Sequence, residues 1–492
     1  MLNLRRLSFQ AVIYAAGNLI VKGSSVLLLA LYTRYLTPAD YGVLAVCTTI
    51  SSVLAFIYPL GLNAGVTRLF HQFDDEERRR FLGSVWLATF VFALVTTGVL
   101  SAIGEPIGRR FLADIPFSPY IKLTLWVAFF NVFGLLPLSV LQMQERPTQF
   151  SLFNIANVVL TSLCVIGLVV WQNQGVAGYL QGMLMGAVVL SFVYIGFMFC
   201  NMRLAFEFRY IKRALSFGLP MVSHSLASWI LELSDRLILQ RYVPLSDLGL
   251  YNVAYQFSGL MMLIAGALNN VWVPFFYKQM DGVVEDRTRS VSRAATYYIG
   301  ALGFVAFVAI LFLKDVLVLL TDDRFHAAHQ FIVPVVLGYL CSALYFIPSN
   351  FLLLKKETAW FIPAITVLAG VGNVVLNLWL VPIWGVWGAV WATLFAYLLV
   401  GVLNWGAALY CHPFPFELRR IFLLFCLIAV FTFLGILCLD LDTGLSIILK
   451  LCLVFMMPLV LWGLGFLDQQ EKQTVRDIVN SWRGRHSVWK IG

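Results

Sequence analysis

The stretch RYLTPADYG at residues 34–42 returns as RYVPLSDLG at residues 241–249, with identities at its first, second, seventh and ninth positions. A second pair, GVAG at residues 175–178 and GVWG at residues 385–388, recurs at an interval of 210 residues, against 207 for the first pair. Two matches at nearly one interval indicate that the chain contains two halves of related structure.

The composition around these stretches is that of a membrane protein. Of 492 residues, 60% are hydrophobic and only 12% are charged, whereas an average soluble domain is about one quarter charged. This balance excludes a soluble globule and leaves no polar stretch long enough for a catalytic or nucleic-acid-binding domain. The eight cysteines lie in or beside apolar runs and lack metal-like spacing, so no metal or resident cofactor is expected.

Apolar runs near the length that spans a bilayer recur along the chain. They are too long for barrel strands, and backbone groups in lipid must bond internally, so each run predicts a transmembrane helix. The expected fold is an all-α membrane protein of about 14 helices. The runs lie at residues 11–33, 42–66, 81–104, 121–142, 150–172, 178–200, 216–240, 249–277, 294–313, 331–354, 359–381, 385–410, 421–439 and 445–466.

The repeat divides the first twelve runs into two halves of six. Because six is even, both halves have the same orientation in the membrane, and an axis along the membrane normal relates them. Parallel six-helix lobes around a central cavity are a transporter architecture. We therefore expect an N-terminal lobe at residues 1–205, a C-terminal lobe at 206–412, and two extra helices with a tail at 413–492.

The basic residues predict the orientation. With a cytoplasmic N-terminus, the inner segments contain 24 of the 34 lysines and arginines and the outer segments contain seven, as the positive-inside rule requires. Both termini are therefore expected in the cytoplasm. Because this distribution also accounts for the net charge of +9, no nucleic-acid partner is expected and the lipid bilayer is the first partner.

Lys22 lies in the middle of the first apolar run. A lysine at that depth costs roughly 2.5–3.5 kcal/mol on insertion scales, so it should face a hydrated cavity or a counter-charge. We favour the cavity, and a purely structural ion pair is the alternative. Arg68 lies at the inner end of the second run, where it could simply extend to the interface.

The seventh run is the most polar one. Glu232, Asp235 and Arg236 are spaced i, i+3 and i+4, so they share one helix face, and Glu232 can pair with Arg236. This pairing would leave Asp235 as a buried carboxylate that could take up a proton or hold a cation.

Polar residues of the eleventh and twelfth runs could extend this site. Asn373 and Asn377 lie one turn apart, and Thr393 lies in the next run. Such side chains usually join helices by hydrogen bonds, and this structural interpretation is favoured. The functional alternative places them with Asp235 in an ion-coupling site.

These residues resemble a known family. The opening, from Gly17 and Lys22 through RYLTPADYG to Gly61-Leu62-Asn63-Ala64 and Arg68, looks like the Wzx-type branch of the multidrug/oligosaccharidyl-lipid/polysaccharide exporter superfamily. The stretch Ser234-Asp235-Arg236, followed by Gly249-Leu250-Tyr251, is similar to the start of that family's second half. The resemblance covers the first twelve runs.

The resemblance implies a non-enzymatic flippase of the bacterial inner membrane, which moves an undecaprenyl-diphosphate-linked oligosaccharide outward by alternating access. It also implies a polysaccharide polymerase and export machinery as further partners. A diphosphate headgroup needs cationic partners in a hydrated cavity, and we expect Lys22, Arg68 and Arg34 to bind it. The resemblance places Asp235, Asn373, Asn377 and Thr393 where related flippases hold a cation, and we expect them, with Glu232 of the seventh run, to couple transport to a sodium ion or a proton. The amides at 373 and 377 argue against a tight sodium site.

Two alternatives differ from this expectation. A multidrug cation antiporter of the same superfamily would need an acid-lined cavity, and the N-terminal half has no acid within its apolar runs. A membrane-embedded polysaccharide-modifying enzyme would need a sizeable outer loop or a reactive cluster at one interface, and the predicted outer loops are short.

Overall fold

The computed structural model describes residues 17, 20–21, 23–112, 114–281, 287–437 and 443–466, together with 468–469, 471–473 and 477. In this part of the chain every regular element is a helix, and 13 helices are long and apolar enough to cross a membrane. A shorter apolar helix, Gly23–Tyr32, precedes them. The predicted all-α membrane fold of about 14 helices is therefore confirmed.

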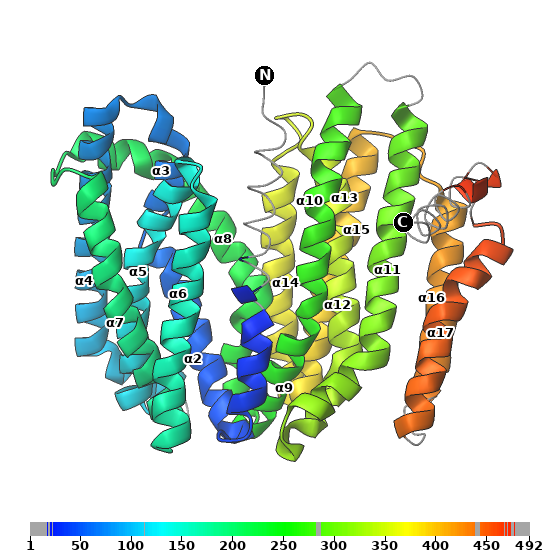
Figure 1. Cartoon of the computed structure of the whole chain (residues 1–492), viewed down its shortest axis with the longest axis horizontal. Coiled ribbons are helices and arrows are strands. Elements are labelled where there is room, and N and C mark those ends of the chain that lie inside the picture. Colours follow the sequence, from blue (N-terminus) through cyan, green and yellow to red (C-terminus); the bar gives the residue numbers. More distant parts are fainter. Residues whose placement is uncertain are drawn as a thin grey trace, which may run out of the picture.

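The helices form two groups, with the N-terminal group on the left of Figure 1 and the C-terminal group on the right. The first group contains α2 (Pro38–Ile57), α3 (Leu62–Leu69), α4 (Asp75–Phe111), α5 (Lys122–Met143), α6 (Pro147–Ile166) and α7 (Gly175–Asn201). The second contains α9 (Leu245–Ser258), α10 (Leu260–Asp281), α11 (Arg287–Leu320), α12 (Ile332–Leu344), α13 (Phe346–Leu352), α14 (Phe361–Trp384) and α15 (Val386–Cys411). The shorter helices are η1 (Phe70–Gln72), η2 (Phe117–Ile121), η3 (Gly167–Trp171) and η4 (Asp323–Phe331).

Two further helices, α16 (Leu418–Leu437) and α17 (Thr443–Gly463), lie at the right-hand edge of Figure 1, beyond α11. Lys450 of α17 is 1% exposed, and its ammonium donates to the carboxylate of Asp315 on α11 at 2.7 Å. The buried lysine therefore has the counter-charge that a position within the bundle demands. This ion pair attaches the extra helices to the C-terminal group.

Helix α8 (Phe208–Tyr242) contacts both groups (Figure 1). In its first part, Gly218 packs on Gly61 so closely that a Cβ on either glycine would lie 2.3 Å from the carbonyl oxygen of the other. In its second part, the Ala227 carbonyl oxygen lies 3.3 Å from the place of a Cβ on Gly370 of α14. The predicted boundary at residue 206 therefore precedes a helix that both groups share, and the division into three domains stays a prediction.

The two copies of the repeated stretch meet where α2 and α9 pack together, at the lower end of Figure 1. The start of α2 is fixed by a capping box, in which the Asp40 amide donates to Thr37 Oγ1 at 3.2 Å and the Thr37 amide donates to Asp40 Oδ2 at 2.8 Å. Pro38 occupies the first helical turn, where its missing N–H costs nothing. The repeated stretch therefore contains the start of α2.

Two glycines of the repeat make a reciprocal contact between the lobes, which we call the glycine clasp (Gly42, Gly249, Pro38 and Leu245). A Cβ on Gly42 would lie 2.0 Å from the Leu245 carbonyl oxygen, and a Cβ on Gly249 would lie 1.8 Å from the Pro38 carbonyl oxygen. Both pairs occupy corresponding positions in the two copies, so the contact has the symmetry of the repeat. Because only glycine permits this approach, the repeated glycine holds the lobes together at this end.

Both copies of the second repeated turn begin with a glycine whose φ is positive. Gly175, the first residue of α7, has a φ of 57°, and Gly385, immediately before α15, has a φ of 56°. Residues with a Cβ rarely adopt this left-handed conformation. The shared geometry supports the predicted parallel repeat.

Arg324 adds a second contact between the lobes at the end that contains the clasp. Its guanidinium donates to the carbonyl oxygens of Thr33 at 3.2 Å and Arg34 at 3.4 Å, in the turn before α2. It also donates to the Asp322 carboxylate at 2.6 Å, and this hydrogen bond lowers the pKa of Asp322. A charged guanidinium therefore binds the turn that leads into α2.

Candidate functional site

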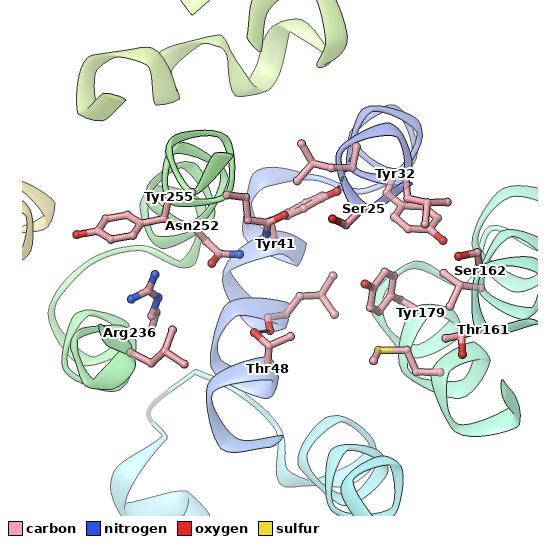
Figure 2. Close-up of a pocket in the computed structure, with 18 of the residues that line it drawn as sticks. Ser25, Tyr32, Tyr41, Thr48, Thr161, Ser162, Tyr179, Arg236, Asn252 and Tyr255 are labelled. Atoms are coloured by element: carbon pink, nitrogen blue, oxygen red, sulfur yellow. Dashed lines mark hydrogen bonds between the residues drawn. The ribbon is translucent and has the colours of Figure 1, made fainter. Parts of the chain in front are cut away.

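A cavity of about 480 Å³ lies between the two lobes (Figure 2). Small-molecule sites in proteins commonly have volumes of about 300–1,000 Å³. Helix Gly23–Tyr32, α2, α6 and α7 form one wall, and residues of α8, α9 and α12 form the other. Its polar lining residues are Ser25, Tyr32, Tyr41, Thr48, Thr161, Ser162, Tyr179, Glu232, Arg236, Asn252, Tyr255, Gln256 and Tyr339.

Hydroxyl, amide and aromatic groups dominate this lining. Figure 2 shows Tyr32 and Tyr179 of the N-terminal lobe on the opposite side of the view from Arg236 of the C-terminal lobe, with Thr48 between them. The rings of Tyr32 and Tyr179 pack edge to face, with centres 5.4 Å apart. Because hydroxyl and amide groups both donate and accept hydrogen bonds, the wall suits a neutral ligand rich in hydroxyl groups.

Glu232 lines both this central cavity and a second one of about 360 Å³, which lies among helices of the C-terminal lobe. The side chain is exposed in the structure, and it has no ion-pair partner among the described residues. Figure 2 labels Arg236 beside the same space. Glu232 therefore presents to both cavities a carboxylate that makes no salt bridge within the described residues.

The predicted side-chain ion pair between Glu232 and Arg236 is wrong. Arg236 Nη1 instead donates to Asp235 Oδ1 at 2.7 Å and to the backbone carbonyl oxygen of Glu232. The Arg236 guanidinium carbon lies 4.6 Å from the ring centre of Tyr255 and 5.4 Å from that of Tyr251, both on α9. These ring contacts hold the guanidinium against its neighbour Asp235, so Glu232 is the acid that remains unpaired.

The structure does bring the other predicted polar residues to Asp235. Its Oδ2 accepts hydrogen bonds from the hydroxyls of Tyr251 and, at 3.4 Å, of Thr393. The Thr393 hydroxyl accepts in turn from Asn373 Nδ2 at 3.4 Å, and Asn377 Nδ2 donates to Asn373 Oδ1 at 3.1 Å. Helices α8, α9, α14 and α15 therefore share one buried network, which we call the Asp235 cluster.

The Asp235 cluster does not fit a resident metal ion. Its single carboxylate is already neutralised by a buried guanidinium, and its other oxygens belong to neutral amides and hydroxyls. Hard cations such as sodium need several oxygen ligands with net negative charge nearby. In the part of the chain that the structure describes, no group of three or more His, Cys, Asp and Glu side chains could hold a metal ion.

Of the three predicted substrate-binding cations, the two that the structure describes, Arg34 and Arg68, do not lie together. Lys22 lies outside the described residues. Arg34 is exposed at the turn before α2, and Arg68 is exposed in α3, which follows α2. Because α2 has 20 residues and a helix rises 1.5 Å per residue, these two arginines lie about 30 Å apart along the bundle. One headgroup cannot contact both at once.

Sequence reasoning missed the tyrosines of the cavity. Tyr41 belongs to the repeated stretch, but its copy has leucine at the corresponding position, Leu248, so the repeat gave no reason to single it out. Hydroxyl residues in the middle of apolar runs, such as Thr48 and Ser162, were the available signal. Such residues are also common where helices pack together, and only the fold shows that these line a cavity.

Solved structures of other membrane proteins share this architecture. The lipid II flippase MurJ, in an inward closed conformation, matches with a TM-score of 0.73 at 14% identity over 95% of this chain and 100% of that one. An inward-facing multidrug resistance MATE transporter of the MOP superfamily matches with a TM-score of 0.63 at 14% identity, over 85% of this chain and 98% of that one. At these identities the likeness establishes the fold, that of a multi-pass membrane transporter.

Sequence relatives point to polysaccharide biosynthesis. The Lsg locus protein 1 of Haemophilus influenzae is 23% identical over 70% of this chain and 83% of its own length. The succinoglycan biosynthesis transport protein ExoT of Rhizobium meliloti is 23% identical over 50% of this chain and 49% of its own length. Residues 31–321 match the family described as "Polysaccharide biosynthesis protein". Because this match covers more than half of the sequence, the chain belongs to that family, the Wzx-type branch that its motifs resemble.

Proposed function

We propose that the protein moves a polyprenyl-diphosphate-linked oligosaccharide from the cytoplasmic to the periplasmic leaflet of the bacterial inner membrane. The observation that supports this most is the central cavity, whose hydroxyl, amide and tyrosine side chains match the hydrogen-bonding capacity of a glycan. The two lobes that form its walls can alternate in access to either side of the membrane. The carrier is undecaprenyl diphosphate, and the glycan is a repeat unit for O-antigen or exopolysaccharide.

The diphosphate needs cationic partners in addition to the glycan site. We assign this role to Lys22, because of its position in the first apolar run, and to Arg68. Arg68 is exposed and has no ion-pair partner among the described residues. Charge-assisted hydrogen bonds from such groups are the usual means of holding phosphate oxygens. Arg34 lies near the opposite end of α2, so it would meet the headgroup only at a different stage of transport. Polymerase and export machinery would then take up the product.

We propose that a proton is the coupling ion and that Glu232 carries it. Glu232 faces both cavities, whereas the Asp235 charge is already matched by Arg236. The other charged and titratable groups that line the two cavities are Arg236, Tyr32, Tyr41, Tyr179, Tyr255, Tyr339, Tyr345 and Tyr397. A carboxylate with this access can exchange a proton with either cavity, so its charge can differ between the two lobe arrangements.

Multidrug antiport and membrane-bound polysaccharide modification have less support. Among the described lining residues of the central cavity, none from the N-terminal lobe is acidic, although a cation antiporter would benefit from acids there. The same lining contains no pairing of a nucleophile with a base of the kind that hydrolases and transferases use. We therefore propose transport without catalysis.

Lys22→Ala is expected to abolish polysaccharide export while membrane abundance stays normal. The reason is that the diphosphate loses its charged partner at mid-membrane, whereas Lys22→Arg keeps the charge and should retain part of the activity. Surface polysaccharide in a complemented deletion strain, together with immunoblots of the membrane fraction, measures both effects. Vesicles with the purified protein and a polyprenyl-diphosphate oligosaccharide then test translocation directly.

Lys356→Ala is the matched control for Lys22→Ala. Lys356 is an exposed lysine between α13 and α14, away from the cavity, so its loss should leave export unchanged. Equal loss of activity from Lys22→Ala and Lys22→Arg, accompanied by degradation of both proteins, would favour a structural ion pair. In that case the assignment of Lys22 to the diphosphate fails.

Topology reporters test the proposed orientation. Fusions after Arg80, Arg213 and Arg293 should report the cytoplasm, and fusions near Ala113 and Asp323 should report the periplasm. The physical reason is the excess of lysine and arginine in the segments assigned to the inside. The opposite result at any two sites would contradict both the orientation and the direction of transport.

A further inference from the structure

The Asp235 cluster contains a positive charge of its own. We infer that the Arg236 guanidinium is the permanent counter-ion of Asp235 and fills the place that a metal cation would otherwise take. This inference goes beyond the proposed transport function, because it concerns the cation that the C-terminal lobe holds whatever the substrate is. Its consequence is that the protein is insensitive to sodium, and that removing Arg236 creates a sodium site.

Burial and charge support this inference first. The Asp235 side chain is 1% exposed and the Arg236 side chain is 5% exposed, so neither charge is stabilised by bulk water. The distance of 2.7 Å between Arg236 Nη1 and Asp235 Oδ1 is that of a charge-assisted hydrogen bond. A metal ion at the same carboxylate would place a second positive charge beside the guanidinium, in surroundings where charges interact strongly.

The surroundings of the guanidinium support the inference independently. The ring centres of Tyr255 and Tyr251 lie 4.6 Å and 5.4 Å from its central carbon, within the range of cation–π attraction. The Glu232 backbone carbonyl also accepts a hydrogen bond from Arg236. A carboxylate, a carbonyl and two aromatic faces together form a site for a planar organic cation.

The oxygens behind Asp235 show what the cluster would bind without Arg236. Thr393 and Asn373 continue the hydrogen-bonded chain from the carboxylate. At its end, Asn377 Oδ1 is buried and has no hydrogen-bond partner in the described structure. Carboxylate, hydroxyl and amide oxygens are ligands that hard cations prefer. Removing the guanidinium would therefore leave an uncompensated carboxylate beside oxygens that sodium can use.

The test compares the melting temperature of the purified full-length protein in sodium chloride and in choline chloride at equal ionic strength. Wild type should melt at the same temperature in both salts, and so should Arg236→Lys, which keeps the charge. Arg236→Gln should melt lower than wild type in choline chloride and should gain about 2–4 °C in sodium chloride, because a bound ion stabilises the folded state. The double variant Asp235→Asn/Arg236→Gln should lose this gain.

Binding of radioactive sodium to the wild-type protein provides a second measurement that does not depend on how well Arg236→Gln folds. Wild type should bind no more sodium than the charge-free double variant does. Stoichiometric sodium binding to wild type that Asp235→Asn abolishes would overturn the inference. A folded Arg236→Gln protein without any sodium response would overturn it as well. Neither readout involves an oligosaccharide, so failure of the proposed transport function would leave both unchanged.

Discussion

Gly249→Ala should push the two lobes apart at the end of the bundle where the glycine clasp holds them. The new Cβ would lie 1.8 Å from the Pro38 carbonyl oxygen, and a backbone atom cannot move aside as a flexible side chain can. Overpacking of this kind costs about 1–3 kcal/mol, and each 1.4 kcal/mol changes an equilibrium about tenfold. The population of the closed arrangement relative to the open one should therefore fall by roughly fivefold to 150-fold. Gly42→Ala should act in the same way, because its Cβ would meet the Leu245 carbonyl oxygen at 2.0 Å.

Distances between spin labels at Ala39 and Asp323 measure this opening in a background without native cysteines. Both positions are exposed, and they belong to different lobes, α2 and η4. The glycine variants should show longer and broader distance distributions than the parent protein. Gly98→Ala is the matched control, because a Cβ there has no heavy atom within 4 Å beyond its own helix. An unchanged distribution in both Gly42→Ala and Gly249→Ala would show that the clasp does not hold the closed end.

Much of the fold could be predicted because membrane helices obey a simple constraint. Backbone groups in lipid must bond within each apolar run, so run lengths predict helices without knowledge of their packing. The repeated stretch also predicted the relation between the halves. It did not reveal that Gly42 and Gly249 pack on each other's repeat, since a glycine in a helical run has several common explanations.

The site could be predicted only in part. Asp235, Asn373, Asn377 and Thr393 do share one network, because each is a polar residue placed where lipid would penalise it. The ion-pair partner of Arg236 could not be predicted, because helical spacing shows which carboxylates are near the guanidinium and not which of them it pairs with. The rings of Tyr251 and Tyr255, contributed by another helix, decide that question.

Asp235→Asn should destabilise the protein by about 3–5 kcal/mol, because it leaves the buried Arg236 guanidinium without its counter-charge. Adding Arg236→Gln to this variant removes the unpaired guanidinium charge, so the double variant should be more stable than Asp235→Asn alone by at least about 1 kcal/mol. Unfolding by denaturing detergent in mixed micelles gives the free energies for the cycle. Glu232→Gln is the control on the same helix, and it should change stability little because the Glu232 carboxylate has no ion pair among the described residues. Additive losses of stability from Asp235→Asn and Arg236→Gln would mean that the Asp235 and Arg236 charges act independently, so that the cluster has no internal counter-ion.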